Sequence, residues 1–463
     1  MSRLFFVLLL ALCVLVPVLA QDSPIPPRPS EETPAPLDES KLTEAQKANV
    51  AVLDAMLGAI RRQFYDRNFA GQNLDALRAR FAAPVAESKP GEPLYAVLRN
   101  LLAEFKVSHL TIVAPDVFQT NFAPEMNNTT SLRPGLDITE LEPGRYFVAA
   151  VLDGSAAQDT GVLRGDRIVE IQGKPAAQSP LLADSGGDPG LPGLPHYFIR
   201  VPEGGAALEL SLQRSAADTQ LVAVSIQCTE TSMIQATKNS VRVIEHKGRR
   251  FGYIHFWHFL SSQMAQTLRA AINNEFKDCD GLIVDLRGRG GSVPVMNACF
   301  APFADPPPMR TRRGLRRQNY NMPRWEKPVV ALQDSGSRSA KEVYAHNWKW
   351  KNVGPLIGET TSGAVLGSTF VALPDGSRLL LPAQEVRRLT YGLVDLEANP
   401  VQPTHPVKDL LAYAQGVDVI KEAGIKVLHG LMPKAEPLPA PAPRDERRKE
   451  EFRFKPMPVR RAG

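Results

Sequence analysis

The sequence has little net charge, few cysteines and no internal repeat. Lys and Arg number 54 against 49 Asp and Glu, so the formal charge of +5 over 463 residues gives no argument for nucleic-acid binding. No zinc-protease motif is present. The glycine-rich stretch at 287–291 lacks the Gly-Lys-Ser/Thr ending that a phosphate-binding P-loop requires. The sequence therefore implies neither a metal nor an organic cofactor.

Cysteine is too scarce for a disulfide framework. Cys13 lies in the N-terminal apolar run, which leaves Cys228, Cys279 and Cys299. An odd number of cysteines in an exported protein allows at most one disulfide and requires none.

The N-terminus indicates export. An apolar stretch from Leu4 to Val18 follows a basic residue and ends in Val18-Leu19-Ala20, which is typical of a secretory signal with a small-residue cleavage site. The stretch is short and Pro17 interrupts it, which favours cleavage over a retained membrane anchor. We expect residues 1–20 to be the signal peptide. The mature protein then starts at Gln21, is periplasmic or secreted, and has no stable membrane span.

The rest of the chain has two proline-rich ends, a linker at 21–40 and a tail at 431–463 that we expect to be disordered. Three regions with different hydrophobic patterns lie between them. Apolar spacing predicts helices at 42–64, 74–81 and 94–105, within an N-terminal helical region of 41–125. Short alternating runs then predict a small β-rich domain at 131–228, with a loop rich in Gly and Pro at 185–193.

Residues 240–430 alternate strand and helix, which predicts a layered and mostly parallel α/β domain. Strands are expected at 251–256, 281–286, 328–332 and 353–357, and helices at 261–276 and 408–428. A basic loop containing Arg310, Arg312, Arg313, Arg316 and Arg317 interrupts the pattern. It is either a solvated loop or a flap that favours acidic substrates or surfaces.

The stretch Gly336-Ser337-Arg338-Ser339-Ala340-Lys341-Glu342 joins a predicted buried strand to a predicted helix. The N–H groups of a first helical turn are unpaired and carry partial positive charge. Such donors can hold an oxyanion beside a nucleophilic hydroxyl. The alternative is that Ser337 or Ser339 is merely an N-cap, with Glu342 completing a capping box to Ser339.

Together these stretches resemble the carboxyl-terminal processing protease family (tail-specific serine peptidases), on its tricorn-core-like branch. The likeness rests on five motifs in the family's order: Phe64-Tyr65-Asp66 with Leu74-Asp75-Ala76-Leu77, Gly161 to Ile168 with Gly173, Asp285 to Gly291, Ser337 to Glu342, and Gly358 to Gly363. The resemblance implies an α/β fold: a layered ClpP/crotonase-like serine protease core, an N-terminal helical region and an inserted PDZ-like β domain.

The simpler bacterial branch of that family places a lysine base 25 positions after the serine. Position 364 is Ala364 here, and no lysine lies between Lys351 and Lys408. The tricorn-like branch instead uses a histidine next to a serine upstream and a glutamate downstream. Ser108-His109 and Glu397 match that pattern. The glutamate-bearing turn departs from it at two positions, Pro400 for a usual glycine and Thr404 for a usual aspartate.

The resemblance thus implies a tetrad. Ser339 is the expected nucleophile, His109 the base, and Ser108 with Glu397 the groups that orient the imidazole. The expected oxyanion donors are the N–H groups of Ala340 and of Gly290, with Gly291 as second choice. A histidine of ordinary pKa predicts a rate that rises through about pH 6 to 7.

Other histidines fit the chemistry less well. His255 and His258 are spaced to point to opposite faces of a strand, and His346 is two helical turns past Ser339. His109 itself has a plain alternative, that of an ordinary half-buried histidine.

PDZ domains add a peptide as an extra strand and hold its terminal carboxylate with backbone N–H groups. The loop expected to do so here contains Pro134, Gly135, Leu136 and Asp137; the alternative is a purely structural β domain. The sequence therefore predicts an exported serine endopeptidase that cuts proteins or peptides with accessible C-termini. The alternative is a non-catalytic peptide- or ligand-binding protein on the same fold.

Overall fold

The computed structural model describes residues 37–185, 187–189, 195–311, 314–316 and 318–432. The predicted signal peptide, most of the linker and nearly all of the predicted tail lie outside these residues. Among the described residues, no helix combines the length and the apolar character that a membrane crossing needs. Cys228, Cys279 and Cys299 are buried and unpaired, so no disulfide joins them.

Three helices begin the described chain, as the apolar spacing predicts: α1 (Glu44–Gln63), α2 (Leu74–Glu87) and α3 (Glu92–Ala103). The first starts at a capping box, in which Gln46 N–H donates to Thr43 Oγ1 and Thr43 N–H donates to Gln46 Oε1. Their apolar faces share one hydrophobic cluster with leucines of a distant hairpin, including Leu366, Leu379 and Leu381.

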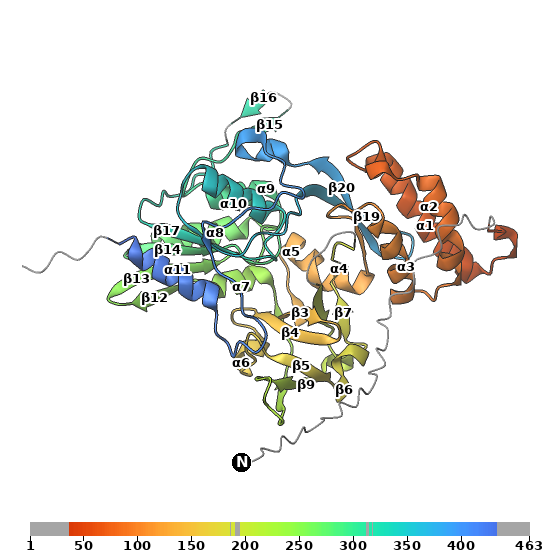
Figure 1. The fold of residues 1–463 in the computed structure, drawn as a ribbon, viewed down its shortest axis with the longest axis horizontal. Coiled ribbons are helices and arrows are strands. Elements are labelled where there is room, and N and C mark those ends of the chain that lie inside the picture. Colours follow the sequence, from red (N-terminus) through yellow and green to blue (C-terminus); the bar gives the residue numbers. More distant parts are fainter. Residues whose placement is uncertain (1–36, 186, 190–194, 312–313, 317, 433–463) are drawn as a thin grey trace, which may run out of the picture.

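That hairpin forms a three-stranded sheet of order β1-β20-β19, which the sequence patterns did not predict. Strand β1 (Thr111–Val113) follows α3, whereas β19 (Leu366–Ala372) and β20 (Arg378–Glu385) come from the far end of the chain. The sheet lies between the N-terminal helices and the remaining core (Figure 1). It therefore brings the segment before β1 beside the segment before β19.

The short helices α4 (Pro115–Asn121) and α5 (Ala123–Asn127) lead into the β domain. Its main sheet has the order β10-β9-β5-β4-β3-β8-β7, and β6 (Lys174–Pro175) pairs with β5. The strands of this order are β3 (Leu136–Glu142), β4 (Arg145–Val151), β5 (Arg167–Ile171), β7 (Leu182–Asp184), β8 (His196–Ile199), β9 (Leu208–Gln213) and β10 (Val222–Ile226). One helical turn, α6 (Ala156–Asp159), follows β4, and β2 (Ser131–Arg133) pairs with β11 (Thr229–Thr231) where the domain begins and ends.

A six-stranded sheet forms the second half of the chain, in the order β12-β13-β14-β17-β18-β21. Its strands are β12 (Arg242–His246), β13 (Arg249–His255), β14 (Gly281–Asp285), β17 (Val329–Gln333), β18 (Leu356–Gly358) and β21 (His405–Pro406). All neighbours except β12 and β13 pair in parallel. The prediction of a layered, mostly parallel α/β core is confirmed.

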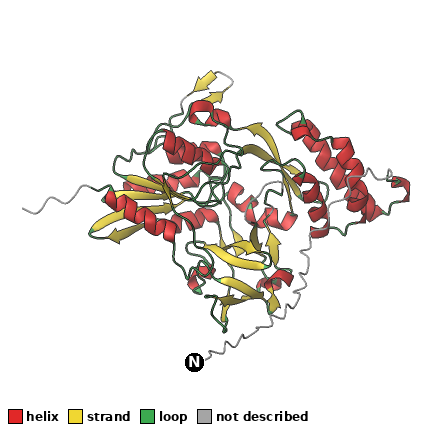
Figure 2. Cartoon of the chain, in the orientation of Figure 1, coloured by secondary structure: helices red, strands yellow, loops and turns green. Residues whose placement is uncertain are grey.

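Helices cover both faces of this sheet (Figure 2). One face packs on α8 (Gln263–Asn273), α9 (Val293–Phe300) and α10 (Ala340–Trp350), with α7 (Met233–Ser240) beside α8. The other face packs on α11 (Val419–Gly430). Side chains alternate between the two faces, as Leu282 and Val284 face one side and Ile283 the other. The basic loop forms a hairpin of β15 (Met309–Thr311) and β16 (Gly314–Arg316), and residues 312, 313 and 317 are outside the described part.

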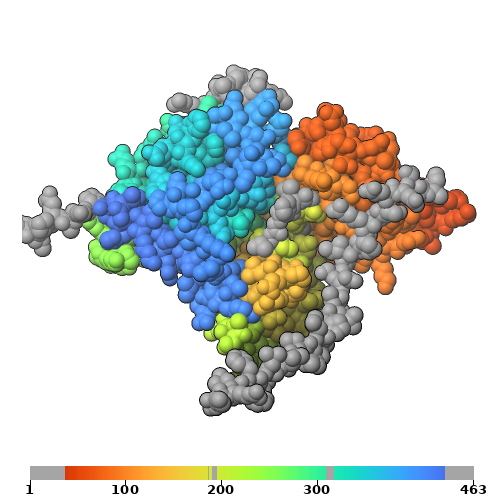
Figure 3. All heavy atoms as spheres, viewed as in Figure 1, coloured from red at the N-terminus to blue at the C-terminus, as the bar shows by residue number. Residues whose placement is uncertain are grey.

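The predicted helix at 408–428 is wrong in its first half. Only Val419–Gly430 is helical, because Tyr413, Gln415 and Gly416 have positive φ, which ends a right-handed helix. The extended part instead lies against the β domain: Tyr413 N–H donates to Gly165 O at 3.0 Å, and Arg164 pairs with Asp409. Figure 3 shows the blue C-terminal residues directly against the gold residues of that domain.

This contact predicts that alanine is tolerated differently at two glycines that both have positive φ. Gly161 and Gly165 both have positive φ, but a Cβ at Gly161 meets no atom within 4 Å, whereas at Gly165 it lies 2.2 Å from Ala414 N. Gly165→Ala should therefore cost about 1–3 kcal/mol more than Gly161→Ala, because it adds overpacking. Thermal melts of the two variants test this, and equal losses of Tm would show that the 409–417 contact is dispensable.

Candidate active site

The nucleophile turn lies where β17 ends and α10 begins. Ser339 is the N-cap of α10, with φ 58° and ψ −125°, and is partly exposed. Ser337 is fully buried, and its Oγ bonds Asp334 Oδ1 at 2.9 Å and Leu286 O at 3.1 Å. Such a strained strand-to-helix turn presents a hydroxyl above the sheet edge. Of the two serines, Ser339 is the one placed to react.

Glu342 holds this turn against the segment before β19. Its buried carboxylate accepts hydrogen bonds from Thr361 Oγ1 and Gly363 N–H at 2.6 Å, from Ala364 N–H at 2.8 Å and from Ser339 N–H at 3.3 Å. Burial nevertheless raises the pKa of Glu342 above its usual value. The glutamate thus joins two separate segments of the site, and does more than cap its own helix.

The predicted oxyanion donors lie around Ser339. Among the described residues, the N–H groups of Ala340, Gly290 and Gly291 have no hydrogen-bond partner. A Cβ on Gly290 would lie 2.5 Å from Ser339 Cβ and 3.2 Å from its Oγ, whereas one on Gly291 would meet the backbone of Phe259. The Gly290 backbone therefore approaches the hydroxyl closely, as only glycine permits, and Gly290 is the better second donor after Ala340.

Lys341 holds the glycine-rich loop through hydrogen bonds to backbone carbonyls, a role that the sequence did not suggest. Its fully buried Nζ donates to Arg287 O at 2.5 Å and to Trp257 O at 3.3 Å, at the start of the glycine-rich loop and beside Phe259. Phe259 N–H in turn donates to Gly290 O at 2.9 Å. Burial lowers the pKa of Lys341 to about 7. Because both acceptors are carbonyls, this lysine braces the loop.

The structure brings Ser108, His109 and Glu397 into one relay. Ser108 Oγ lies 2.7 Å from His109 Nδ1 and 2.8 Å from Glu397 Oε2, and Ser108 N–H donates to Glu397 Oε1 at 2.9 Å. An ionised carboxylate only accepts, so the single Ser108 proton points to Glu397. Nδ1–H then donates to Ser108, which leaves Nε2 unprotonated. This is the tautomer that a general base needs.

The same relay reaches the nucleophile through the backbone. Val365 N–H donates to Glu397 Oε2 at 2.7 Å, while Ala364 O accepts from Ser339 N–H at 2.9 Å. Position 364, where the simpler branch has its lysine, thus lies directly beside Ser339. Its side chain is a buried methyl group that cannot act as a base.

His109 sits in an electrostatic setting that the sequence did not predict. It is 6% exposed, with φ 59°, and its own N–H donates to Asp188 Oδ1 at 2.7 Å. Arg338 Nη2 donates to Asp188 Oδ2 at 2.5 Å and lies 3.4 Å from His109 Nδ1. Burial first, and then the Arg338 charge, lower the pKa of His109 to about 3. Asp188 was hidden from sequence reasoning in the Gly- and Pro-rich loop of the β domain.

Ser339 and His109 are not joined by a hydrogen bond in the part of the chain that the structure describes. Catalytic hydrogen bonds are often long in unliganded enzymes and tighten when substrate binds. Three residues of the predicted tetrad, Ser108, His109 and Glu397, are therefore linked by hydrogen bonds, and the Ser339 turn meets them through residues 364 and 365.

The expected peptide-binding loop is placed less favourably. Pro134, Gly135 and Leu136 are buried, and the carbonyls of the first two accept from Ala157 and Leu152 N–H. Strand β3, which follows this loop, is not an edge strand, because β8 pairs with it at Ile138↔Tyr197 and Thr139↔His196. A peptide added as a strand to this side of β3 would therefore compete with β8 at Ile138 and Thr139.

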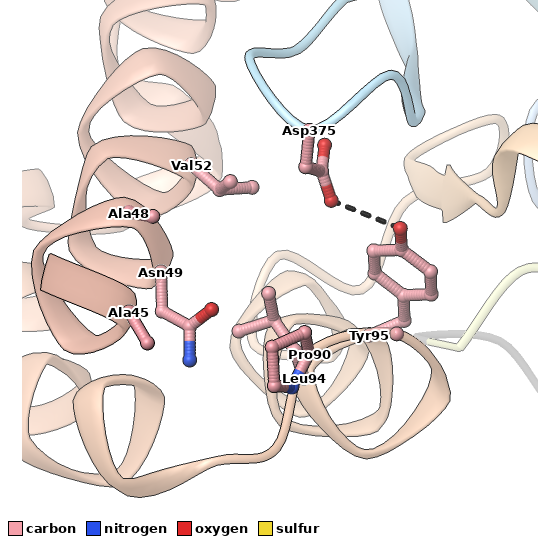
Figure 4. Close-up of a pocket in the computed structure, with 9 residues that line it drawn as sticks. Ala45, Ala48, Asn49, Val52, Pro90, Leu94, Tyr95 and Asp375 are labelled. Atoms are coloured by element: carbon pink, nitrogen blue, oxygen red, sulfur yellow. Dashed lines mark hydrogen bonds between the residues drawn. The ribbon is translucent and has the colours of Figure 1, made fainter.

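The remaining candidates lie elsewhere. His258 pairs with buried Glu125 at 2.9 Å, and His346 bonds Tyr391 O. No group of three or more His, Cys, Asp or Glu suited to a metal occurs within the described ranges. A cavity of about 220 Å³ lies between α1 and α3 and includes Tyr95 and Asp375, which bond at 2.9 Å (Figure 4). None of its lining residues belongs to the Ser339 site.

Known proteins resemble this chain in sequence and in fold. Residues 250–407 match the family model described as Peptidase family S41. The chain is 24% identical over 410 residues to a tricorn protease homolog of Streptomyces coelicolor, covering 82% of this chain and 32% of that one. It is 24% identical over 290 residues to the carboxy-terminal processing protease CtpB of Bacillus subtilis, covering 61% and 56%. The chain thus spans about a third and just over half of the length of these relatives.

A longer match is the carboxyl-terminal-processing protease of Synechocystis, 22% identical over 403 residues and covering 83% of this chain and 88% of that one. Among solved structures, the photosystem II D1 C-terminal processing protease superposes with a TM-score of 0.50 at 20% identity, covering 82% and 99%. An S41 protease of Bacteroides fragilis gives 0.52 at 15% identity, covering 82% and 98%. These likenesses establish the fold.

The lowered pKa of His109 changes the expected pH profile. A base works when neutral, and a pKa lowered to about 3 keeps the imidazole neutral to lower pH, so the rate should already be near its maximum by about pH 5 instead of rising through pH 6 to 7. Arg338→Gln removes one cause of the lowering and should move the rise to higher pH. Initial rates from pH 4 to 8 test this, with a thermal melt at each pH to confirm folding. A wild-type midpoint near the ordinary histidine value of about 6.5 would contradict it.

Proposed function

The chain carries a peptidase family S41 domain over residues 250–407, and on that premise we propose that the whole protein is an exported serine endopeptidase. Its substrates are proteins or peptides. The observation that carries the proposal is the Glu397–Ser108–His109 relay, which meets the Ser339 turn at residues 364 and 365. Export rests on the apolar N-terminal stretch alone.

In the proposed reaction Ser339 Oγ attacks the substrate carbonyl while His109 Nε2 takes its proton. This step requires the two groups to come within hydrogen-bond distance when substrate binds. The relay holds Nδ1–H and stabilises the imidazolium that forms, as the acidic member of a catalytic triad does. His109 then returns the proton to the leaving amine, and water repeats the sequence to release the acyl group.

The negative charge on the carbonyl oxygen would be held by N–H groups of Ala340 and Gly290. These donors belong to the backbone, and Lys341 and Phe259 fix the Gly290 loop before substrate arrives. Preorganised donors of this kind contribute about 10²–10³-fold each to the rate.

A serine-directed fluorophosphonate probe tests the proposal. We expect labelling on Ser339, retained in Ser337→Ala and lost in Ser339→Ala; labelling should fall by several orders of magnitude in His109→Ala because the base is gone. Mass spectrometry of the labelled protein locates the adduct, and the same digest should give Gln21 as the first residue if the signal is removed. A folded wild type that takes no label would favour the alternative, a non-catalytic binding protein.

Capture of substrate C-termini by the β domain is the finer part of the proposal. It rests on the likeness of this domain to a PDZ domain, with the Pro134–Asp137 segment leading into β3, and it requires a peptide to displace β8 from that strand or to bind beside it. Two peptides with the same cleavage site and a tail of about ten residues, one ending in a carboxylate and one in an amide, separate the possibilities. An extended tail of that length spans about 33 Å.

We expect KM to be about tenfold lower for the free carboxylate, because one charge-assisted contact at the end of the tail is lost on amidation. The rate of fluorophosphonate labelling, which needs no tail, is the control. Equal KM values for the two peptides would leave a protease whose β domain does not hold C-termini.

A further inference from the structure

An ion pair lies beside His109, the proposed base, and the Glu397–Ser108–His109 relay does not need this ion pair. Arg338, the residue before Ser339, donates to Asp188 Oδ2 at 2.5 Å, and the other oxygen of Asp188 accepts the His109 N–H. Asp188 comes from the β domain, 150 residues earlier in the chain. The arginine side chain is 25% exposed and that of Asp188 9% exposed. One cation therefore remains within reach of solvent directly next to the nucleophile.

The Arg338 charge weakens His109 as a base, which suggests that Arg338 has another role. Its charge lowers the pKa of His109 and so makes the base weaker. A neutral side chain at position 338 would avoid that penalty. The carboxylate of Asp188 offsets the charge when the site is empty, through a single short contact to one guanidinium nitrogen.

Two other arginines of this region, Arg287 and Arg133, are paired with carboxylates of their own. Arg287 makes paired hydrogen bonds to both Asp285 and Asp418 from a 13% exposed position. Arg133 pairs with buried Glu125 and bonds Thr120 O. Arg338 differs because Asp188 contacts only one nitrogen of its five-donor fork, which leaves donors for a second carboxylate.

We propose that Arg338 is a specificity-determining residue, which binds an acidic side chain of the substrate beside the scissile bond, and that Asp188 takes the place of that side chain when no substrate is bound. This inference rests on the proposed function and names its substrate class. A guanidinium fork and a carboxylate fit one another in geometry as well as in charge. Entry of the substrate carboxylate beside or in place of Asp188 keeps the charge near His109 compensated.

The test uses the full-length protein and peptides blocked at both ends, so that no terminal carboxylate is present. A mixed peptide library with mass-spectrometric product analysis first gives the residues flanking the cut bonds. A matched pair with Glu or Gln at the enriched position then gives a ratio of kcat/KM values. We expect a ratio of about ten in the wild type, as a partly desolvated charge pair provides. A third peptide, with Gln and a free carboxylate next to the cut bond, shows whether a chain end is accepted equally.

The variants separate Arg338 from its surroundings. Arg338→Gln should bring the ratio to about one, and Arg338→Lys, which keeps the charge but loses the fork, should give an intermediate value. Asp188→Asn should raise the ratio, since it removes the internal competitor. The matched control is Arg289→Gln, in which a neighbouring half-buried arginine of the glycine-rich loop is replaced and the ratio should stay near ten.

A wild-type ratio near one, or a ratio unchanged in Arg338→Gln, overturns the inference. If the preference for Glu is lost in Arg289→Gln but kept in Arg338→Gln, Arg289 and not Arg338 binds the acidic side chain, and the inference is again overturned. These failures are distinct from failure of the proposed function, because Ser339 would still take the fluorophosphonate label. Absence of both label and cleavage in the wild type would overturn the function and the inference together.

Discussion

Two carboxylates accept the N–H groups of two consecutive residues, and the whole site depends on this arrangement. Glu342 takes the N–H of Ala364 and Glu397 takes that of Val365, at 2.8 and 2.7 Å. The first carboxylate belongs to the nucleophile turn and the second to the relay behind the base. One short stretch of backbone thus sets the distance between Ser339 and His109. The side chain of Ala364 is a methyl group, so position 364 contributes to the site through its backbone alone.

Positive φ values occur at or next to the residues of the predicted tetrad. His109, Ser339 and Ala398, which follows Glu397, have φ values of 59°, 58° and 58°, a region that costs non-glycine residues about 1–3 kcal/mol. The surrounding hydrogen bonds keep these conformations in place. Strand β1 and the β19–β20 hairpin supply the rigid frame, because β1 begins two residues after His109 and β19 one residue after Val365. His109 and the 364–365 backbone are therefore positioned by strands of one sheet that are far apart in sequence.

Much of this was available from the sequence. Apolar periodicity located α1, α2 and α3, and the alternation of strand and helix located the sheet from β13 to β18. The strand–serine–helix pattern identified the Ser339 turn, and family likeness supplied the partners that the fold places together. Hydrophobic periodicity and strand–helix alternation depend on neighbouring residues, so they predict well the helices and strands that form within one continuous segment.

What escaped prediction was long-range. The roles of Asp188 and Lys341 depend on which loop lies beside which, and neither position carries a periodic signal. The extended segment at 409–417 has apolar residues at helical spacing, but its contacts with Gly165 and Arg164 determined its shape. The occupied edge of β3 has the same origin, since only the pairing with β8 reveals it.

The position of Asp188 has a consequence for how this architecture can be recombined. Inserted β domains look like exchangeable modules, joined to the core at two neighbouring points by β2 and β11. Here the insert also delivers a carboxylate that bonds both the residue before the nucleophile and the backbone of the base. A chimera carrying the insert of a relative would inherit that relative's charge at this point, and grafting a new docking module would rewrite the electrostatics of the reaction centre.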